Sequence, residues 1–310
     1  MTPAIPTSLA RKAALSDIEL RLLHVFSEIV RCNGFSAAQA SLGMSQATIS
    51  VHMRHLEERL GVRLCERGRS GFHMTNEGTQ IYSAVLDLFG SIERFQGAVG
   101  DIQGELTGRL RFGTVDAMVT NDALNLQVAI GNFARQAPRV HLDIDIAAPQ
   151  VLSQGVLSGR YQIVLMPAQQ QLSQMRSQEV FAETQNLYCG MGHPLFTCEN
   201  ADLTPDLLAA QAFAGRSYMQ EAPICGVDFH WNAVTAHMEG TLLLLLSGAF
   251  IGFLPTHYAA DSVRNAQLRA LAPDRMKFDD RFQIVYSRER STRAADLLAR
   301  AVVSGIGGSH

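Results

Sequence analysis

Residues 34–58 read GFSAAQASLGMSQATISVHMRHLEE and predict two short helices joined by a tight turn. Ser36 is expected to cap the first helix, and Gly43 supplies the break that ends it. Ser45 is expected to cap the second helix, because a serine side chain there accepts a hydrogen bond from the first turn. Alanines in the first helix allow the two helices to cross closely, which is typical of a helix-turn-helix.

The second helix has two distinct faces. Its apolar side chains recur at steps of four, three and four along one stripe: Ile49, Met53, Leu56 and Leu60. Its opposite face carries polar side chains: Gln46, Thr48, Ser50 and Arg54. Small and polar groups at the front of a capped helix suit the major groove, where base edges must be approached closely. The pattern therefore favours a DNA-binding recognition helix over a plain helical hairpin.

The same stretch resembles the LysR-type transcriptional regulators, whose pattern here is F-[ST]-x-A-A-x-x-L-x-x-S-Q-[PS]-A-[IV]-S-x-x-[IV]-[RK]-x-L-E-x-x-L-G-x-x-L-F-x-R. The matching residues are Phe35, Ser36, Ala38, Leu42, Ser45, Gln46, Ile49, Ser50, Arg54, Leu56, Glu57, Leu60, Gly61, Leu64 and Arg67. The chain departs from the pattern at Ala47-Thr48 in place of Pro-Ala, at Val51 in place of a long polar residue, and at Cys65 in place of Phe. These departures affect which bases are contacted, not whether the module is present.

A short hairpin is expected after the second helix. Residues 62–67 form a strand pattern, 68–71 a turn, and 72–74 a returning strand. Arginines at its tip are placed to meet phosphates or a minor groove, and a solvated surface hairpin is the alternative. The stretch RGRSGFHMTNEG is similar to the R-x-x-x-G-x-x-L-T-x-x-G that follows the recognition helix in LysR-type proteins. The predicted DNA-contacting residues are Ser36, Gln39, Ser45, Gln46, Ala47, Thr48, Ser50, Arg54, Arg67 and Arg69.

Composition places the chain among globular proteins with one locally basic segment. Its 310 residues suggest about two domains, and a hydrophobic content of 47% is enough for sizeable cores. The formal net charge is −3, but nine basic and six acidic residues lie between Arg11 and Thr75, which gives this segment a charge of +3. A basic module on an acidic body fits specific DNA binding better than general polyanion binding.

The sequence predicts neither export nor a membrane span. Its five cysteines are dispersed without CxxC spacing, so we expect free thiols in a reducing cytosol. The N-terminal residues lack the apolar core of a signal peptide. The most apolar run, 241–254, is too short to span a bilayer and is expected to be a buried helix followed by a buried strand. We therefore expect a cytoplasmic protein.

Familiar catalytic and metal-binding motifs are missing from the sequence. It contains no GxSxG, HExxH, P-loop, CxxC pair or strand-anchored GxGxxG. His230, His237 and Glu239 could form a metal site, but histidines without that role are the stronger interpretation. Cys189 and Cys198 could form a redox pair, but Cys189 lies in a strand pattern and is expected to be buried and inert. We therefore expect no catalytic residue, no metal and no cofactor.

A long helix is expected to begin after Thr75, which would cap it. Its apolar residues alternate steps of four and three without a slip: Ile81, Val85, Leu88, Ile92, Phe95, Val99 and Ile102. A period of 3.5 held over three heptads indicates pairing with another long helix. The alternative is an amphipathic helix packed on its own domain. We expect a dimer seam formed by Ile81, Val85, Leu88, Ile92, Phe95 and Val99, and the family resemblance favours antiparallel linker helices.

Strands and helices alternate from Gly108 onward. Strands are expected at 110–115, 138–146, 161–166, 186–190, 212–215, 251–254 and 282–286, and helices at 123–136 and 151–158. This alternation predicts a parallel sheet. Residues 186–195 and 245–255 resemble the L-x-L-V-x-x-x-x-H-P-L and L-V-A-x-G-x-G-I-x-x-L-P of LysR-type effector domains. The resemblance implies two linked α/β subdomains of the periplasmic-binding-protein type, with a ligand cleft between them.

Polar residues follow several of the expected strands. Ligands of open α/β sheets bind beyond the carboxyl ends of strands, where helix N-termini offer free N–H groups. The expected effector-binding residues are Thr114, Val115, Asp116, Met166, Arg216, Ser217 and Thr256. The planar fork of Arg216 matches a carboxylate, and a surface ion pair is the alternative for this arginine. Asp116 would either bind an amine or neutralise Arg216.

These patterns predict an α/β protein with an N-terminal winged helix-turn-helix, a long linker helix and a C-terminal effector domain of two subdomains. The expected segments are a flexible extension at 1–15, the DNA-binding domain at 16–75, the linker and dimerisation helix at 76–104, and the effector-binding domain at 105–310. Expected partners are promoter DNA, a small-molecule effector, which Arg216 suggests is anionic, a second copy in a dimer or tetramer, and RNA polymerase. The rival interpretations are an enzyme with an appended DNA-binding module and an architectural DNA binder without an effector.

Overall fold

The computed structural model describes residues 17–68, 71–102, 106–168, 175–219, 221–287 and 292–305. Contacts divide the chain into two units, one ending at Ile92 and the other beginning at Glu93. This boundary falls inside a single long helix, so each unit contains part of that helix. The expected flexible extension at 1–15 lies outside the described residues. Within the described ranges, no helix is both long enough and apolar enough to cross a membrane.

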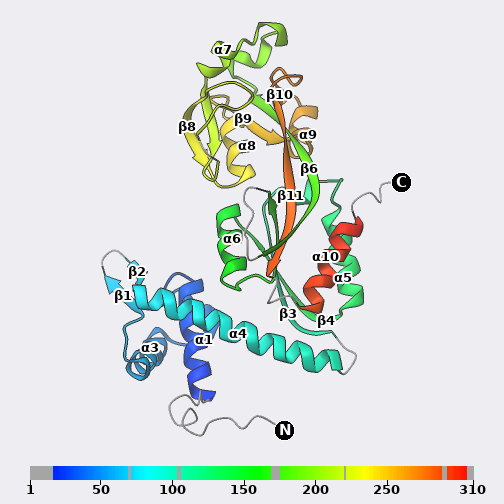
Figure 1. Cartoon of the computed structure of the whole chain (residues 1–310). Coiled ribbons are helices and arrows are strands. Elements are labelled where there is room, and N and C mark those ends of the chain that lie inside the picture. Colours follow the sequence, from blue (N-terminus) through cyan, green and yellow to red (C-terminus); the bar gives the residue numbers. More distant parts are fainter. Residues whose placement is uncertain are drawn as a thin grey trace. The chain divides into compact units, whose positions relative to one another are not determined.

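The first unit is a winged helix-turn-helix (Figure 1). Its elements are α1 (Asp17–Arg31), α2 (Ala38–Leu42), α3 (Gln46–Leu60), β1 (Cys65–Gly68) and β2 (Gly71–Met74). β1 and β2 pair antiparallel with Cys65 opposite Met74, which confirms the predicted hairpin. The helices enclose one core, whose fully buried side chains include Phe26, Ile29 and Ile49.

The helix boundaries confirm most of the capping pattern. The side chain of Ser45 accepts a hydrogen bond from the backbone N–H of Thr48 at 3.2 Å, so Ser45 caps α3. Gly43 ends α2 in the left-handed conformation with φ of 62°. The prediction that Ser36 caps α2 is wrong: the capping position is Ala37, which has no side-chain cap. The chain is already turning before Ala37, and Ser36 Oγ accepts a bond from the side chain of Gln39 instead.

The long helix α4 (Asn76–Ile102) begins where the sequence predicts. Thr75 Oγ1 accepts a hydrogen bond from the backbone N–H of Gly78 at 2.8 Å and donates one to the carbonyl of Arg63 at 2.6 Å. A Cβ atom on Gly78 would lie 1.9 Å from the carbonyl oxygen of Leu64. Only glycine therefore lets the start of α4 lie this close to the segment that leads into the wing.

The second unit is built on one mixed sheet with helices packed against it. Its strands are β3 (Thr107–Thr114), β4 (Arg139–Ile146), β5 (Ile163–Pro167), β6 (Met175–Gly190), β7 (Ala212–Arg216), β8 (His230–Thr235), β9 (Ile251–Pro255), β10 (Leu268–Ala270) and β11 (Lys277–Ser287). The strand order is β4-β3-β5-β11-β6-β9-β7-β8, and β10 pairs with β6. The helices are α5 (Leu126–Gln136), α6 (Pro149–Leu157), α7 (Pro205–Ala209), α8 (Met238–Leu246), α9 (Thr256–Arg264) and α10 (Arg293–Gly305). Single-turn 3-10 helices are η1 (Met118–Thr120), η2 (Pro194–Thr197) and η3 (Asn200–Asp202).

The prediction of a parallel sheet is wrong for its centre. β3 is parallel to β4 and β5, and β7 is parallel to β8 and β9, but β6 and β11 run antiparallel to each other and to β9 and β5 respectively. These two long strands join the two ends of the unit, as Figure 1 shows. The sequence indicated only the apolar parts of each strand, 186–190 and 282–286, because their other residues are largely polar.

The second unit consequently has two subdomains with separate cores. The first subdomain comprises β3, β4, β5, α5, α6 and α10, and its core includes Phe112, Phe133 and Leu298. The second subdomain comprises β7, β8, β9, α7, α8 and α9, and its two clusters include Phe213 and Leu245. The predicted helix and strand at 241–254 are confirmed as α8 and β9. The expectation that this helix is buried throughout is wrong, because Leu243 is 66% exposed.

Candidate DNA-binding surface and effector site

The front of α3 presents the polar residues that the sequence predicts. Gln46, Ala47 and Thr48 are exposed, and so is Arg54 further along the helix. Ile49, Met53 and Leu56 are buried in the core, so the apolar stripe fixes which face points outward. The prediction fails only at Leu60, which is 42% exposed because it lies in the last turn, beyond the part of α3 that the core covers.

Hydrogen bonds hold the turn between α2 and α3. Gln39 Oε1 accepts a bond from the backbone N–H of Gln46 at 3.2 Å, so α2 supplies a partner to an N-terminal amide of α3. Ser50 Oγ donates to the carbonyl of Gln46 at 2.7 Å. Gln39 and Ser50 therefore support the recognition helix, while Ser36 is exposed beside the turn.

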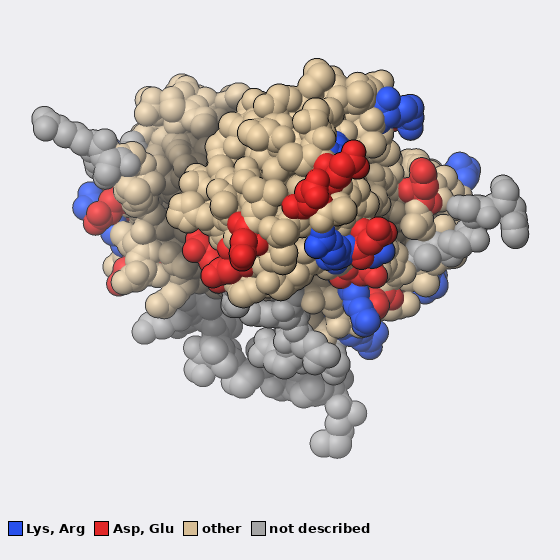
Figure 2. Space-filling view, turned by 90° about the horizontal axis from the view of Figure 1, so that it is seen from above, with Lys and Arg blue, Asp and Glu red and all other residues tan. Residues whose placement is uncertain are grey.

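Two further predicted DNA contacts, Arg67 and Arg69, come from the segment that was expected to form the wing. Arg67 lies in β1 opposite Phe72, but its side chain is outside the described residues, as is all of Arg69. The face shown in Figure 2 carries acidic and basic side chains in small scattered groups between larger uncharged areas.

The predicted dimer seam on α4 divides into two parts. Ile81, Val85 and Leu88 pack against the core of the first unit, and Val85 is buried. In contrast, Phe95 is 70% exposed and Val99 is 38% exposed. Half of the heptad pattern is therefore explained by packing within one chain, and the exposed half begins after Ile92.

Glu93 connects the second half of α4 to the sheet of the second unit. Glu93 accepts a hydrogen bond from Arg111 of β3 at 2.5 Å and one from Gln162 at 3.1 Å. Gln162 in turn accepts a bond from the backbone N–H of Arg111 at 2.7 Å. Both residues lie within the first subdomain, so this end of α4 is held by a specific polar contact.

The residues after β3 contact the second subdomain. Asp116 Oδ2 accepts a hydrogen bond at 2.5 Å from the backbone N–H of Met238, the first residue of α8. A carboxylate at a helix N-terminus is favourable because of the free N–H groups and the helix dipole. Thr114 and Val115 are buried, and Thr114 Oγ1 has no hydrogen-bond partner. Asp116 is therefore engaged by the start of α8 in this structure.

Arg216 is buried and engaged by the protein itself. It is 4% exposed, and its Nη2 donates to Gln185 Oε1 at 2.6 Å and to the carbonyl of Phe253 at 3.2 Å. The alternative of a surface ion pair is therefore wrong. The other predicted residues differ in exposure: Met166 is buried, Ser217 is exposed and Thr256 is partly buried.

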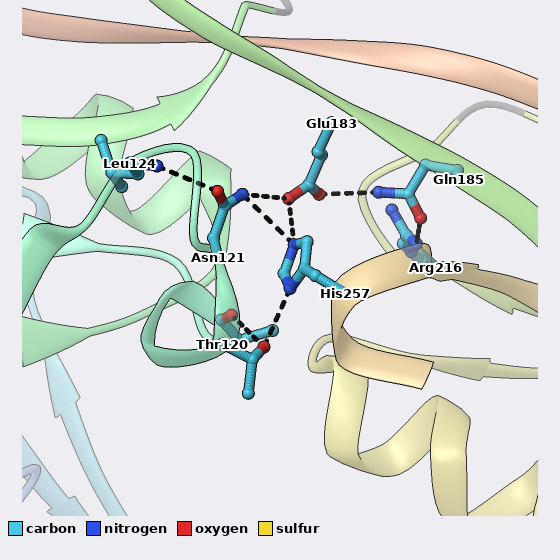
Figure 3. A network of polar contacts seen from close by, with 8 residues as sticks. Thr120, Asn121, Leu124, Glu183, Gln185, Arg216 and His257 are labelled. Atoms are coloured by element: carbon cyan, nitrogen blue, oxygen red, sulfur yellow. Dashed lines mark hydrogen bonds and ion pairs between the residues drawn. The ribbon is translucent and has the colours of Figure 1, made fainter. Parts of the chain in front are cut away.

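The sequence prediction missed the polar residues that lie between the two groups of strand ends. Glu183 and Gln185 on β6 form a hydrogen-bonded chain with Asn121 and His257 that leads to Arg216 (Figure 3). Glu183 and Gln185 alternate with exposed or partly exposed neighbours and share a face with Phe181 and Leu187. That two-residue period was the available signal, because it places polar side chains on the buried face of a strand.

Burial perturbs two acidic groups beside this chain. The pKa of Asp280 on β11 is raised to about 6, mainly by burial. The nearby Arg216 opposes this shift, and Glu183 adds to it. Burial also raises the pKa of Tyr218, although Arg216 acts in the opposite direction. Arg216 therefore lies close to both Asp280 and Tyr218.

The thiol of Cys189 is buried in β6. Burial raises the pKa of Cys189 to about 11, which disfavours the reactive thiolate, in line with the expected inert thiol. In the described part of the chain, no group of three or more His, Cys, Asp or Glu side chains is arranged to hold a metal ion.

A winged helix-turn-helix joined by a long helix to a two-subdomain α/β unit defines a class of DNA-binding regulators that carry a small-molecule-binding domain. The family model "Bacterial regulatory helix-turn-helix protein, lysR family" matches residues 20–79, and "LysR substrate binding domain" matches residues 103–305. The chain therefore belongs to the LysR family of transcriptional regulators, which confirms the resemblance and the predicted fold class.

Individual relatives agree with this assignment. The chain is 37% identical over 278 residues to the HTH-type transcriptional activator BauR of Pseudomonas aeruginosa, which covers 89% of this chain and 91% of BauR. Its fold is similar to that of full-length CbnR complexed with target DNA, with a TM-score of 0.62, 16% identity, and coverage of 93% and 100% of the two chains. Full-length LysG of Corynebacterium glutamicum, with bound effector Arg, has a TM-score of 0.53, 15% identity, and coverage of 93% and 97%.

Proposed function

We propose that this regulator binds promoter DNA with the front of α3 and changes its DNA binding when a small molecule occupies the region between the two subdomains. The observation that carries the DNA-binding part is the Ser45-capped start of α3, where Gln46, Ala47 and Thr48 are exposed while the opposite face is buried. Because its target is DNA, we place the protein in the cytoplasm. No described group of residues favours an enzymatic activity over this function.

The proposed DNA contacts fall into two groups. Residues on α3 and its N-cap are placed to contact base edges: Ser45, Gln46, Ala47, Thr48, Ser50 and Arg54. Ser36, Gln39, Arg67 and Arg69 are proposed to contact or position the phosphate backbone. Full-length CbnR, which has a similar fold, forms a complex with its target DNA, and this supports DNA binding by the first unit. BauR is named an activator, which supports RNA polymerase as a further partner.

We propose that the effector lies beside the ends of β3, β5, β7 and β9. Its proposed contacts are Thr114, Val115, Asp116, Met166, Arg216, Ser217 and Thr256. The unpartnered hydroxyl of Thr114 supports a ligand there, because a buried hydroxyl without a partner is unfavourable. The guanidinium of Arg216 has five N–H groups, more than its bonds to Gln185, Phe253 and Tyr218 use, which supports a ligand carboxylate. The LysG structure with bound Arg supports an amino acid as the ligand class.

We propose that α4 joins two copies of the chain through its second half. Phe95 and Val99 are exposed apolar residues in heptad register, whereas Val85 is buried in its own unit. Phe95→Asp should therefore reduce the molar mass measured by light scattering while the first unit stays folded. An unchanged mass for the folded variant would remove the second half of α4 from the interface.

Genomic footprinting of the purified protein tests the main proposal. We expect protection of a limited set of promoter sequences whose half-sites are about 10–10.5 base pairs, or a multiple of that, apart. Metabolites of the genes next to these promoters would then be screened for a shift in melting temperature. Binding that shows no preference among sequences would contradict the proposal, and it would favour the architectural interpretation.

A further inference from the structure

Two sets of hydrogen bonds join the two subdomains of the second unit, which is called the regulatory unit from here on. In the first set, Asp116 of the first subdomain accepts the backbone N–H of Met238 at the start of α8. In the second set, His257 of α9 bonds Thr120 Oγ1 through Nδ1 at 2.8 Å and Glu183 Oε2 through Nε2 at 2.8 Å (Figure 3). Asp116 and Thr120 lie only four residues apart, so one short segment makes contacts with both α8 and α9.

Glu183 lies at the centre of the second set. Glu183 is 4% exposed and lies on β6, one of the two strands that run between the subdomains. Oε1 accepts a bond from Gln185 at 2.7 Å, and Oε2 accepts bonds from His257 and, at 3.3 Å, from Asn121.

These donors come from different parts of the unit. Asn121 belongs to the first subdomain, His257 belongs to the second, and Gln185 lies on the connecting strand. A buried carboxylate is tolerated only while its hydrogen bonds are made. A change in the relative setting of the subdomains would remove at least one donor from Glu183. The network therefore favours one setting over its alternatives, which is the requirement for a two-state element.

We infer that Asp116, Thr120, Asn121, Glu183 and His257 form a latch that holds the two subdomains in the setting seen here and that effector binding opens. The inference rests on the proposed function in one respect, because Asp116 is also a proposed effector contact. A ligand amine that engaged the Asp116 carboxylate would compete with the Met238 N–H and would open one side of the latch. Effector binding and subdomain setting would then be coupled through a single side chain.

Hydrogen exchange of the full-length protein tests whether the latch opens as one unit. The variant is His257→Ala, and the reporter is the Met238 amide, which bonds Asp116 and makes no bond to His257. We expect exchange at Met238 to rise by about tenfold or more, together with exchange at Leu124, whose amide bonds Asn121. A purely local role for His257 would leave the Met238 amide unchanged, and that result would overturn the inference.

Two further variants control for general destabilisation. Thr120→Val removes one exposed hydroxyl from the latch and should give a smaller increase at the same two amides. Thr184 lies on the opposite face of β6 from Glu183, and its Oγ1 donates to Asp279 of β11. Thr184→Val removes that bond and should leave both amides unchanged. If His257→Ala fails to fold, Thr120→Val still decides the outcome, because no change at Met238 in that variant contradicts the latch.

DNA binding decides whether the latch is regulatory. The wild type and Thr120→Val are compared on a DNA fragment found by footprinting, without any added ligand. We expect their affinities or footprint lengths to differ, with affinity changing on the order of 5- to 150-fold if the latch carries a typical allosteric coupling. Failure of the wild type to bind any fragment specifically would contradict the proposed function. Specific binding that is identical in both proteins, despite altered exchange, would contradict the regulatory role of the latch alone.

Discussion

The recognition helix and the centre of the regulatory unit place their polar side chains in opposite ways. On α3, Gln46, Thr48 and Arg54 are exposed, and the fold is held by apolar residues on the other face. In the regulatory unit, Glu183, Gln185 and Arg216 are buried and bonded to one another. Polar groups that are exposed are accessible to a partner, while polar groups that are buried also determine stability. The same kind of substitution should therefore have different consequences at the two sites.

The largest effect is expected for Arg216→Ala. This change removes the hydrogen-bond donor to Gln185 Oε1 and the guanidinium that lies close to the buried Asp280. Removing one member of a buried charged network costs about 3–5 kcal/mol. We expect the free energy of unfolding to fall by that amount in denaturant titrations. The matched variant is Arg264→Ala, whose exposed pair with Asp261 should contribute less than ~1 kcal/mol. Equal effects of the two variants would contradict the distinction.

The next effect concerns Asp280 and depends on pH. Its pKa is raised from 3.8 to about 6, so the folded state holds this proton more tightly than the unfolded state does. The contribution of Asp280 to stability is therefore full below about pH 4, and it falls as the pH rises toward about 6. Asp280→Asn should remove this fall and raise the free energy of unfolding at pH 7 by roughly 3 kcal/mol relative to wild type.

Unfolding curves measured from pH 4 to pH 8 check this prediction. The comparison is the difference between variant and wild type, since other carboxylates also titrate in this range. Asp279→Asn is the matched control, because Asp279 is exposed on the same strand and bonds only Thr184 among the contacts described for its side chain. A constant difference between Asp280→Asn and wild type across the range would show that burial of Asp280 does not perturb its titration.

On α3, Arg54→Ala should affect DNA binding and leave stability almost unchanged. An arginine that contacts a base contributes ~1–3 kcal/mol of discrimination, and an exposed substitution changes stability by less than ~0.5 kcal/mol. Mobility shifts on the footprinted fragment and on an unrelated fragment, at fixed salt, separate specific from general binding. Arg59→Ala is the control on the same helix, where the side chain pairs with Glu19. Loss of binding to both fragments alike would identify Arg54 as a phosphate contact.

The smallest effect is expected for Ser45→Ala. The change removes the hydrogen bond from the Thr48 N–H and should cost about 1 kcal/mol of stability in the first unit. It should also weaken DNA binding, because the capped turn carries Gln46 and Thr48. Ser45→Asn restores an acceptor and should recover stability. Full recovery of stability without recovery of DNA binding would indicate that Ser45 itself contacts DNA.

The contrast between the two sites also explains how far the sequence could be interpreted. The DNA-binding unit follows from local signals: Ser45, Gly43 and Thr75 mark helix ends, and Ile49, Met53 and Leu56 define a face within one helix. Ser36 was predicted wrongly because a serine near a helix start is a cap only if the helix begins at the next residue, and here it begins two residues later.

The regulatory centre depends on residues that are far apart in the chain. Asn121, Glu183, Arg216 and His257 meet only because β6 and β11 cross between the subdomains. The sequence located the strand ends and therefore Thr114, Asp116 and Arg216, but it could not show that Arg216 is bonded to Gln185. The heptad period on α4 was likewise ambiguous, since Val85 and Phe95 satisfy the same pattern in a core and on a surface.

The chain order of the regulatory unit has a consequence for its synthesis. The first subdomain begins at β3 but is completed by α10, whose residues Leu298 and Val302 belong to its core. The DNA-binding unit ends at Ile92, about 200 residues before α10 is made. At a synthesis rate of ~5–20 residues per second, the recognition helix can fold on the ribosome roughly 10–40 seconds before the regulatory unit is complete. During that interval, a nascent chain presents its DNA-binding surface without the unit that controls it.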